Sequence, residues 1–311
     1  MLPIRISLVP ACRPTARDCR GFGLLFVISL SAACRSPVPS GESSAGVVRE
    51  DRPSATATTH DADDPQISRF SPIDWSHYGL LLFRTVQGDK LDAAALWTSG
   101  DLIERMLNQL AEHGPTRDAA AFQDAPSRLA YLINAHNLLV LAEFRSQLAA
   151  SSTTAMRVGR GRYAIDGRSE TVLTLRDKAI RLAGADWRVG LALFSGRSDG
   201  PRLNRRPFTA DMLDIQLDDV VRRAVSSPSV VLIDHGEVKR LLLCRELYVI
   251  RGTLLRDYER RYQTTGASVL NALLEWASPF DRATLNSAVG YVVSQMPEND
   301  AAPFLDSLPT K

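Results

Sequence analysis

Residues 127–148 read SRLAYLINAHNLLVLAEFRSQL and form the longest helical pattern of the chain. It is apolar on most of its circumference, a pattern that predicts a long helix at the centre of the core. Three polar residues, Asn134, His136 and Asn137, interrupt the apolar run. A buried carboxamide costs free energy unless its hydrogen bonds are met, so we expect both asparagines either to brace neighbouring backbone or to line a ligand pocket. His136 points to another side of the helix, where a structural role is the simpler expectation.

Helical spacing of apolar residues continues on both sides of this stretch. One amphipathic stripe runs from Tyr78 to Val86, and a second, from Leu102 to Leu110, stops before Gly114-Pro115. Further helices are expected at 211–225, 254–262, 267–277 and 281–294. Strand patterns are few: 163–165 and 171–173 around Asp166-Gly167 predict a hairpin, while 188–194 (RVGLALF) and 230–233 predict buried strands. The sequence therefore predicts an α+β fold, a helix-rich single domain with a small β-sheet.

The composition is that of a folded chain without a basic binding surface. Of 311 residues, 45% are hydrophobic and 23% charged, and the formal net charge is +2. Residues 1–33 hold four arginines and one aspartate, so the positive excess lies in this leader and the remainder is slightly acidic. Because nucleic-acid binding needs basic residues concentrated on one face of the fold, we expect no nucleic-acid partner.

The leader has the pattern of a secretory signal. Its apolar run, residues 21–33, is 13 residues long and too short to span a bilayer. Small residues lead into Cys34, as in a bacterial lipobox, which implies lipid attachment to Cys34 and a signal peptide over 1–33. A plain cleaved signal and an uncleaved anchor are the alternatives. Residues 34–67, rich in Ser, Thr and Pro, predict a flexible linker, and residues 68–311 the folded domain. This organisation predicts an outer-membrane or periplasmic lipoprotein of the bacterial cell envelope.

A glycine-rich loop follows the predicted strand at 188–194. Its residues 196–200 match the G-x-S-x-G pattern of a nucleophile elbow, in which Ser198 would be a hydrolase nucleophile. The context argues against an elbow, because prolines interrupt the chain and the next helix begins only near Thr209. Arg197, Arg202, Arg205 and Arg206 form a basic cluster that either grips an anion or belongs to a solvated loop.

Cysteine positions exclude a disulfide framework. Of the four cysteines, Cys12 and Cys19 lie in the leader and Cys34 is the proposed lipidation site, which leaves Cys244 alone in the domain. A multi-cysteine zinc site is excluded by the same count, and the sequence predicts neither a metal nor a cofactor. Cys244 stands among large apolar residues, so we expect a buried thiol of raised pKa and low reactivity.

Four segments together resemble the bacterial and plant domain-of-unknown-function family 547 (DUF547). GDKLDAAAL (88–96) is similar to G-x-V-D-Y-x-A-L, and LAYLINAHN (129–137) to L-A-F-W-I-N-A-Y-N. DWRVGLALFSGRSDGPRL (186–203) is similar to D-P-R-I-H-F-A-L-x-C-G-A-x-S-C-P-P-L, and FTADMLDIQLDD (208–219) to Y-x-x-x-x-L-D-x-Q-L-D-x. The resemblance spans about 68–303 in the same order.

The chain departs from this family at its reactive positions. Gly190 stands where the family has histidine, and Ser195 and Gly200 stand where it has two loop cysteines. The family's S-L-x-D-I-E-H signature is reduced to residues 174–177, and 178–180 then lack its acid and histidine. The resemblance thus implies a retained scaffold without a Cys–His reaction.

Two functions compete. The leading hypothesis is a non-catalytic, lipid-anchored envelope domain that binds a small ligand or an envelope protein, with Asn134, Asn137, Arg197 and Arg202 as binding candidates. The alternative is a hydrolase or acyl-transfer enzyme in which Ser195 or Ser198 is the nucleophile and His136 or His235 the base. The alternative loses its base if neither histidine comes within hydrogen-bond reach of either serine or of Cys244.

Overall fold

The computed structural model describes residues 71–149 and 158–298. These residues belong to one compact unit, 65–311. The signal peptide, Cys34 and the whole of the predicted linker (34–67) lie outside the described residues, so their assignment stays a prediction. Within the described ranges, no helix combines the length and the apolar character needed to cross a membrane.

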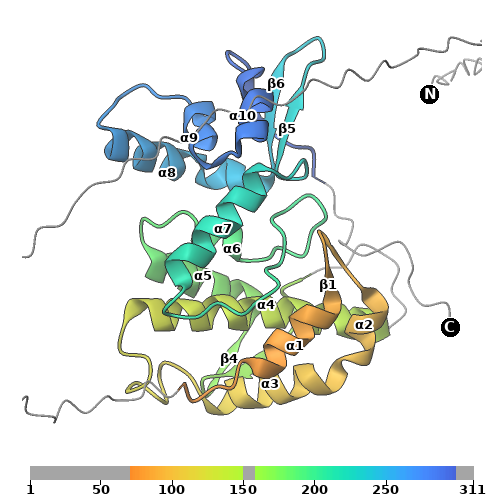
Figure 1. The fold of residues 1–311 in the computed structure, drawn as a ribbon. Helices are drawn as coiled ribbons and strands as arrows, with labels where there is room; N and C mark the ends of the chain where they lie inside the picture. The colour runs from red at the N-terminus through yellow and green to blue at the C-terminus, as the bar shows by residue number, and fades with distance from the viewer. Residues whose placement is uncertain (1–70, 150–157, 299–311) are drawn as a thin grey trace, which may run out of the picture. The chain divides into compact units, whose positions relative to one another are not determined.

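The long helix predicted at the centre is present as α4, Ala125–Ala149. Leu138 and Leu139 on it are fully buried, as are both asparagines. Buried residues of α4 enter two apolar clusters, one with the N-terminal helices and one with the C-terminal elements. Figure 1 shows α4 lying between α1 and α3 on one side and α7 on the other. The helix therefore unites the two halves of the core, as expected for a segment that is apolar almost all round.

The N-terminal elements pack on one side of α4. They are α1 (Ser76–Thr85), β1 (Val86–Gln87), β2 (Lys90–Leu91), α2 (Ala93–Thr98) and α3 (Gly100–Glu112). The two predicted amphipathic stripes correspond to α1 and α3. The strands β1 and β2 form a two-residue ladder, and Asp92 then caps α2 by accepting the N–H of Ala95 at 2.9 Å.

The predicted hairpin around Asp166-Gly167 is present, but its second strand differs from the prediction. The strands β3 (Tyr163–Ile165) and β4 (Arg168–Glu170) pair antiparallel, with φ of 52° at Asp166 and 71° at Gly167. Residues 171–173 were wrongly assigned to the strand. Thr171 instead caps α5 (Val172–Ala183), because its hydroxyl accepts the N–H of Thr174 and Thr174 returns the bond.

The prediction of a buried strand at 188–194 is also wrong. Residues Val189–Ala192 form α6, a single helical turn whose members are all buried. A short continuous apolar run gives the same pattern in a buried strand and in a buried helical turn, so periodicity does not separate them. The burial was predicted correctly and the backbone conformation was not.

The C-terminal part adds four helices and one three-stranded sheet. In order they are α7 (Leu213–Val225), β5 (Val231–Asp234), β6 (Arg240–Leu243), α8 (Arg245–Tyr262), α9 (Val269–Trp276), α10 (Pro279–Asn286) and β7 (Val292–Gln295). β6 lies between β5 and β7, antiparallel to the first and parallel to the second. The helix expected over 281–294 ends at Asn286, and its last part is the strand β7. The predicted α+β class is confirmed: 53% of the described residues are helical, and the sheets are small, with two or three strands each.

Candidate functional site

The side chains of both asparagines of α4 form hydrogen bonds with backbone groups of other segments. Asn134 Nδ2 donates to the Phe208 carbonyl at 2.8 Å, and Asn134 Oδ1 accepts the Phe208 N–H at 2.8 Å. Asn137 Nδ2 donates to the Ala192 carbonyl at 3.0 Å, and its Oδ1 accepts the Phe194 N–H at 2.9 Å. Each carboxamide thus donates to a backbone carbonyl and accepts a backbone N–H, as a neighbouring β-strand would. These two hydrogen bonds hold a loop against the helix. These contacts support the bracing role for both asparagines.

Neither histidine candidate reaches a nucleophile. His136 is buried, with Nδ1 3.0 Å from Asn137 Oδ1, and burial lowers its pKa to about 4, so the ring is neutral at pH 7. His235 is exposed between β5 and β6, with Nδ1 2.8 Å from the Tyr291 hydroxyl. Ser195 Oγ and Ser198 Oγ are buried, and neither has a hydrogen-bond partner among the described residues. The serine–histidine pairs of the enzyme alternative are therefore not assembled.

A carboxylate, Glu246, lies close to Ser195 instead. A Cβ at position 200 would lie 2.4 Å from Ser195 Oγ and 3.6 Å from Glu246 Oε2, so both atoms face Gly200. Glu246 is 7% exposed, and its Oε2 has no hydrogen-bond partner in the described part of the chain. It sits in the first turn of α8, where the helix dipole favours a negative charge. Glu246 is not among the site residues predicted from the sequence, because the helix predicted in this region begins only at residue 254, whereas α8 begins at Arg245.

The predicted burial of Cys244 is confirmed. It is the N-cap of α8, fully buried, and its Sγ accepts the N–H of Leu247 at 3.5 Å. Burial, and after it the nearby Glu246 carboxylate, raise the pKa of this thiol to about 12. A thiol of this kind is almost entirely protonated at neutral pH and is a poor nucleophile.

The arginines of the glycine loop hold the loop together. Arg197 forms a fork with Asp199, at 2.9 Å from Nε to Oδ1 and 2.8 Å from Nη2 to Oδ2, and its Nη1 lies 3.4 Å from Glu298. This pairing raises the pKa of Arg197 above its usual range. Arg202 Nη1 donates to the Ser198 carbonyl at 3.1 Å. Arg197 and Arg202, predicted as binding residues, thus make contacts within the loop and to Glu298.

A cavity of about 320 Å³ lies elsewhere, and sequence reasoning missed it. Its wall is formed by Ala185, Asp186, Trp187 and Arg188, by Asp257, Arg260 and Arg261 at the end of α8, and by Trp276 at the end of α9. We call this space the two-tryptophan cavity. The rings of Trp187 and Trp276 meet edge to face with centroids 5.9 Å apart, and Trp187 Nε1 donates to Asp257 Oδ2 at 3.2 Å.

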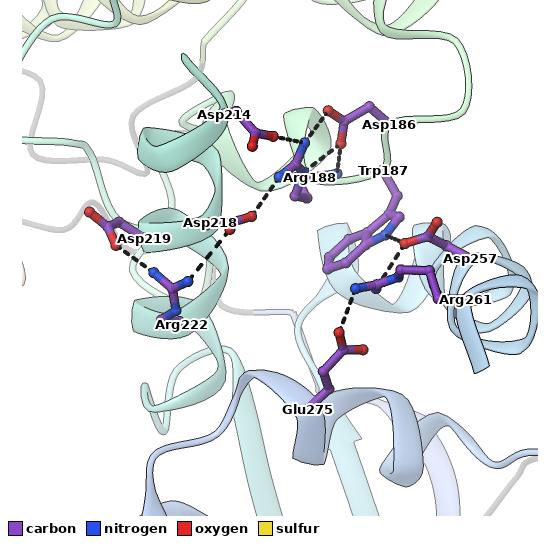
Figure 2. A network of polar contacts seen from close by, with 10 residues as sticks. All are labelled: Asp186, Trp187, Arg188, Asp214, Asp218, Asp219, Arg222, Asp257, Arg261 and Glu275. Carbon is purple, nitrogen blue, oxygen red and sulfur yellow. Dashed lines mark hydrogen bonds and ion pairs between the residues drawn. The ribbon is translucent and has the colours of Figure 1, made fainter. Parts of the chain in front are cut away.

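The charged groups of this cavity form two paired sets, shown in Figure 2. In the first, Arg188 binds three carboxylates, those of Asp186 (2.9 Å), Asp214 (2.7 Å) and Asp218 (2.5 Å), which raise its pKa. In the second, Arg261 pairs with Asp257 at 2.9 Å and with Glu275. Burial raises the pKa of Glu275, while Arg261 opposes that change. The first set includes residues of the DWR and LDIQLDD segments, a signal that could have drawn attention to this region.

The cavity and the glycine loop are separate places joined by α8. Glu246 in the first turn and Asp257 near the other end are eleven residues apart, which corresponds to about 16 Å along a helix axis. The described residues contain no group of three or more His, Cys, Asp or Glu arranged to hold a metal ion. Comparisons of the chain with protein-family profiles, curated proteins and solved structures gave no match, so the resemblance to family 547 stays a prediction.

Proposed function

We propose that this protein is a non-catalytic, lipid-anchored domain of the bacterial cell envelope that binds a small ligand in the two-tryptophan cavity. One observation carries the non-catalytic part: the Ser195 and Ser198 hydroxyls are buried without a hydrogen-bonded base among the described residues. The leader and the lipobox-like residues before Cys34 support the anchoring part. The described domain is then held near a membrane by the predicted linker.

Serine catalysis needs a base that removes the hydroxyl proton as the nucleophile attacks. His136 is neutral and therefore able to accept a proton, but its Nδ1 is engaged with Asn137 and it does not contact either serine. Cys244 is disfavoured as a nucleophile by its raised pKa and its full burial. The residues that the alternative needs are thus present in the sequence but separated or blocked in the fold.

Ligand binding is supported by the form of the cavity. Its volume falls at the small end of the range for small-molecule sites, and its wall combines two indole rings with five charged side chains. The single carboxylate of Asp257 contacts three donor side chains, those of Trp187, Arg260 and Arg261. Side chains held in this way lose little conformational entropy when a ligand binds.

A second candidate function rests on Glu246. Its Oε2 faces the same point as Ser195 Oγ, so a rotation of either side chain would bring a carboxylate base to the serine. This version of the enzyme alternative replaces histidine by glutamate.

A fluorophosphonate probe separates these functions, because it captures activated serines. We expect the purified domain to stay unlabelled, and Glu246→Gln to change nothing. Stoichiometric labelling of Ser195 that disappears in the Glu246→Gln variant would establish the enzyme and overturn the non-catalytic proposal. A matched control is Glu104→Gln, since Glu104 is an exposed acid on α3.

A further inference from the structure

The outer side of α1 carries two apolar side chains that face solvent. Phe83 is 70% exposed and Leu80 is 39% exposed. They lie three residues apart on the helix, so the two side chains adjoin. Arg84 follows Phe83 directly, stands one turn beyond Leu80 and is exposed as well. An aromatic ring, an aliphatic side chain and a cation therefore share one exposed side of this helix.

The loop that leads to α7 runs along α1 next to these side chains. A Cβ added at Gly79 would lie 3.6 Å from Pro207 Cδ, so Pro207 packs on the helix one turn before Phe83 and on the same face. Near the other end of α1, residues 202–203 share a small pocket with residues of the hairpin 86–91. The part of the loop between these two contacts thus lies alongside Phe83.

This part of the loop presents Arg205 and Arg206, and both are exposed. Hydrogen bonds fix its backbone. Asn204 Nδ2 donates to the Arg206 carbonyl at 2.9 Å, and Asn204 Oδ1 accepts the Arg205 N–H at 3.1 Å and the Arg223 guanidinium at 2.9 Å. Because the backbone is held in this way, both arginines start from fixed positions beside α1 and lose little conformational freedom when they bind a partner.

The charges in this place are mainly positive. Arg84, Arg205 and Arg206 have no acid paired with them among the described residues. Asp89, in the hairpin, interacts instead with Arg223. Asp74 and Asp211 precede α1 and α7, so they lie beyond the Pro207 end of the loop. A partner on this surface would therefore meet three uncompensated guanidinium groups next to apolar side chains, a pattern that suits phosphate groups attached to an apolar phase.

The point where the predicted tether joins the domain favours a membrane as that partner. The described chain begins at Ser71, five residues before α1, so the predicted linker from Cys34 leads to the same helix. A flexible chain of the length between Cys34 and Ser71 has a root-mean-square span of about 30–35 Å. An anchor at Cys34 would thus keep α1 close to the bilayer, where the effective concentration of lipid headgroups is high.

We propose that this surface, made of Leu80, Phe83, Arg84, Arg205 and Arg206, docks the anchored domain onto an anionic phospholipid bilayer. The two apolar side chains enter the headgroup region, and the three arginines bind lipid phosphates. Each arginine near an anionic surface strengthens binding by about fivefold. The contact by itself is too weak to survive washing of membranes, but it orients a domain that the anchor already holds. This inference rests on the anchoring part of the proposed function.

The test is co-sedimentation of the full chain, produced without its leader and without lipid, with phospholipid vesicles. The vesicles contain phosphatidylcholine alone or phosphatidylcholine with about one-third phosphatidylglycerol. We expect half-saturation at millimolar lipid, and at least about tenfold tighter binding to the anionic vesicles. High salt should remove most of this difference, because it screens the arginine–phosphate attraction.

Phe83→Ser tests the apolar contact. We expect it to weaken vesicle binding by at least about tenfold, since one exposed ring no longer leaves water on docking. The matched control is Phe280→Ser, at a phenylalanine of α10 that is 81% exposed, and this variant should bind like the parent. Both positions are exposed, so folding is expected to survive, and thermal melts verify this.

The double variant Arg205→Gln/Arg206→Gln tests the basic contact. We expect it to weaken binding to the anionic vesicles by about 25-fold, which is the product of two fivefold effects, and to leave phosphatidylcholine vesicles unaffected. The control with the same loss of charge is Arg181→Gln/Arg256→Gln, at exposed positions of α5 and α8, for which we expect less than about a threefold change.

Three results would overturn the proposal: equal binding of both kinds of vesicle, equal effects of Phe83→Ser and Phe280→Ser, or no binding at about 10 mM lipid. A dimer in analytical ultracentrifugation that Phe83→Ser dissociates would also overturn it, because a second copy would then cover the surface. The vesicle assay does not depend on the anchor, since the chain carries no lipid. Failure of the anchor is measured separately, by the fractionation of Cys34→Ser with washed membranes.

Discussion

Replacing Asn137 by alanine removes the contact that ties the 192–194 segment to the central helix. The Asn137 carboxamide is 1% exposed and pairs with the Ala192 carbonyl at 3.0 Å and the Phe194 N–H at 2.9 Å. Without it, both backbone groups remain buried with no partner on α4. The substitution therefore strands one acceptor and one donor at the same time.

The expected cost follows from these two groups. Leaving a buried hydrogen-bonding group unpaired costs about 1–3 kcal/mol, so the pair amounts to about 2–6 kcal/mol. Because alanine has a higher helix propensity than asparagine, the substitution also stabilises α4 by roughly 0.5 kcal/mol, which offsets part of this loss. A net loss of about 2–5 kcal/mol is a large part of the roughly 5–15 kcal/mol that holds a domain folded.

Urea unfolding of the purified domain, followed by circular dichroism, measures this loss. The control is Asn108→Ala, at an exposed asparagine of α3, for which we expect a change within about 0.5 kcal/mol. A loss below about 1 kcal/mol for Asn137→Ala, or one equal to that of Asn108→Ala, would show that the carboxamide does not brace this loop.

Four further predictions follow from the same structure and sequence. Leu138→Ala, at a fully buried position of α4, should cost about 2–5 kcal/mol in the same urea assay; a melt unchanged from wild type would contradict its place in the core. Cys34→Ser should move the protein from the membrane to the soluble envelope fraction on cell fractionation, and unchanged membrane association would disprove the lipid anchor. Cys244 should react slowly with iodoacetamide in the folded protein and quickly in urea, because burial raises its pKa to about 12; rapid native labelling with an apparent pKa below the roughly 8.5 of a free thiol would refute this. Burial lowers the pKa of His136 from 6.5 to about 4, so this histidine binds a proton less readily in the folded than in the unfolded protein. The free energy of unfolding should therefore fall by a few kcal/mol as the pH drops from about 6.5 to 4. If a His136→Gln variant loses as much stability over this pH range as wild type, other groups cause the pH dependence.

The central helix and its polar positions were predictable because their signals are local. A stretch that is apolar nearly all round is buried wherever it packs, and a buried asparagine must find partners. The sequence could not tell which groups those partners would be. Asn134 pairs with Phe208, 74 positions away along the chain, and Asn137 with Ala192 and Phe194, so only the folded chain brings them together.

The errors in secondary structure have the same origin. Residues 188–194 and 292–295 were assigned from their own apolar pattern, as a strand and as part of a helix. The first forms a helical turn, while the second pairs with β6 as a parallel strand. Short apolar runs have no decisive local preference, so neighbouring elements select the conformation.

Local patterns in the sequence are enough to predict the α+β class, the core helix and the burial of Cys244, and they include the leader pattern that predicts an anchored protein. Each of these depends on composition or on spacing within a few turns of chain. The packing of distant segments sets two further features: no histidine among the described residues bonds to Ser195 or Ser198, and Trp187, Asp257 and Trp276 line the same cavity. These residues are separated by 19 to 89 positions in the sequence, so their distances in space depend on how the helices and loops pack. Local conformational preferences do not determine which distant side chains face one another.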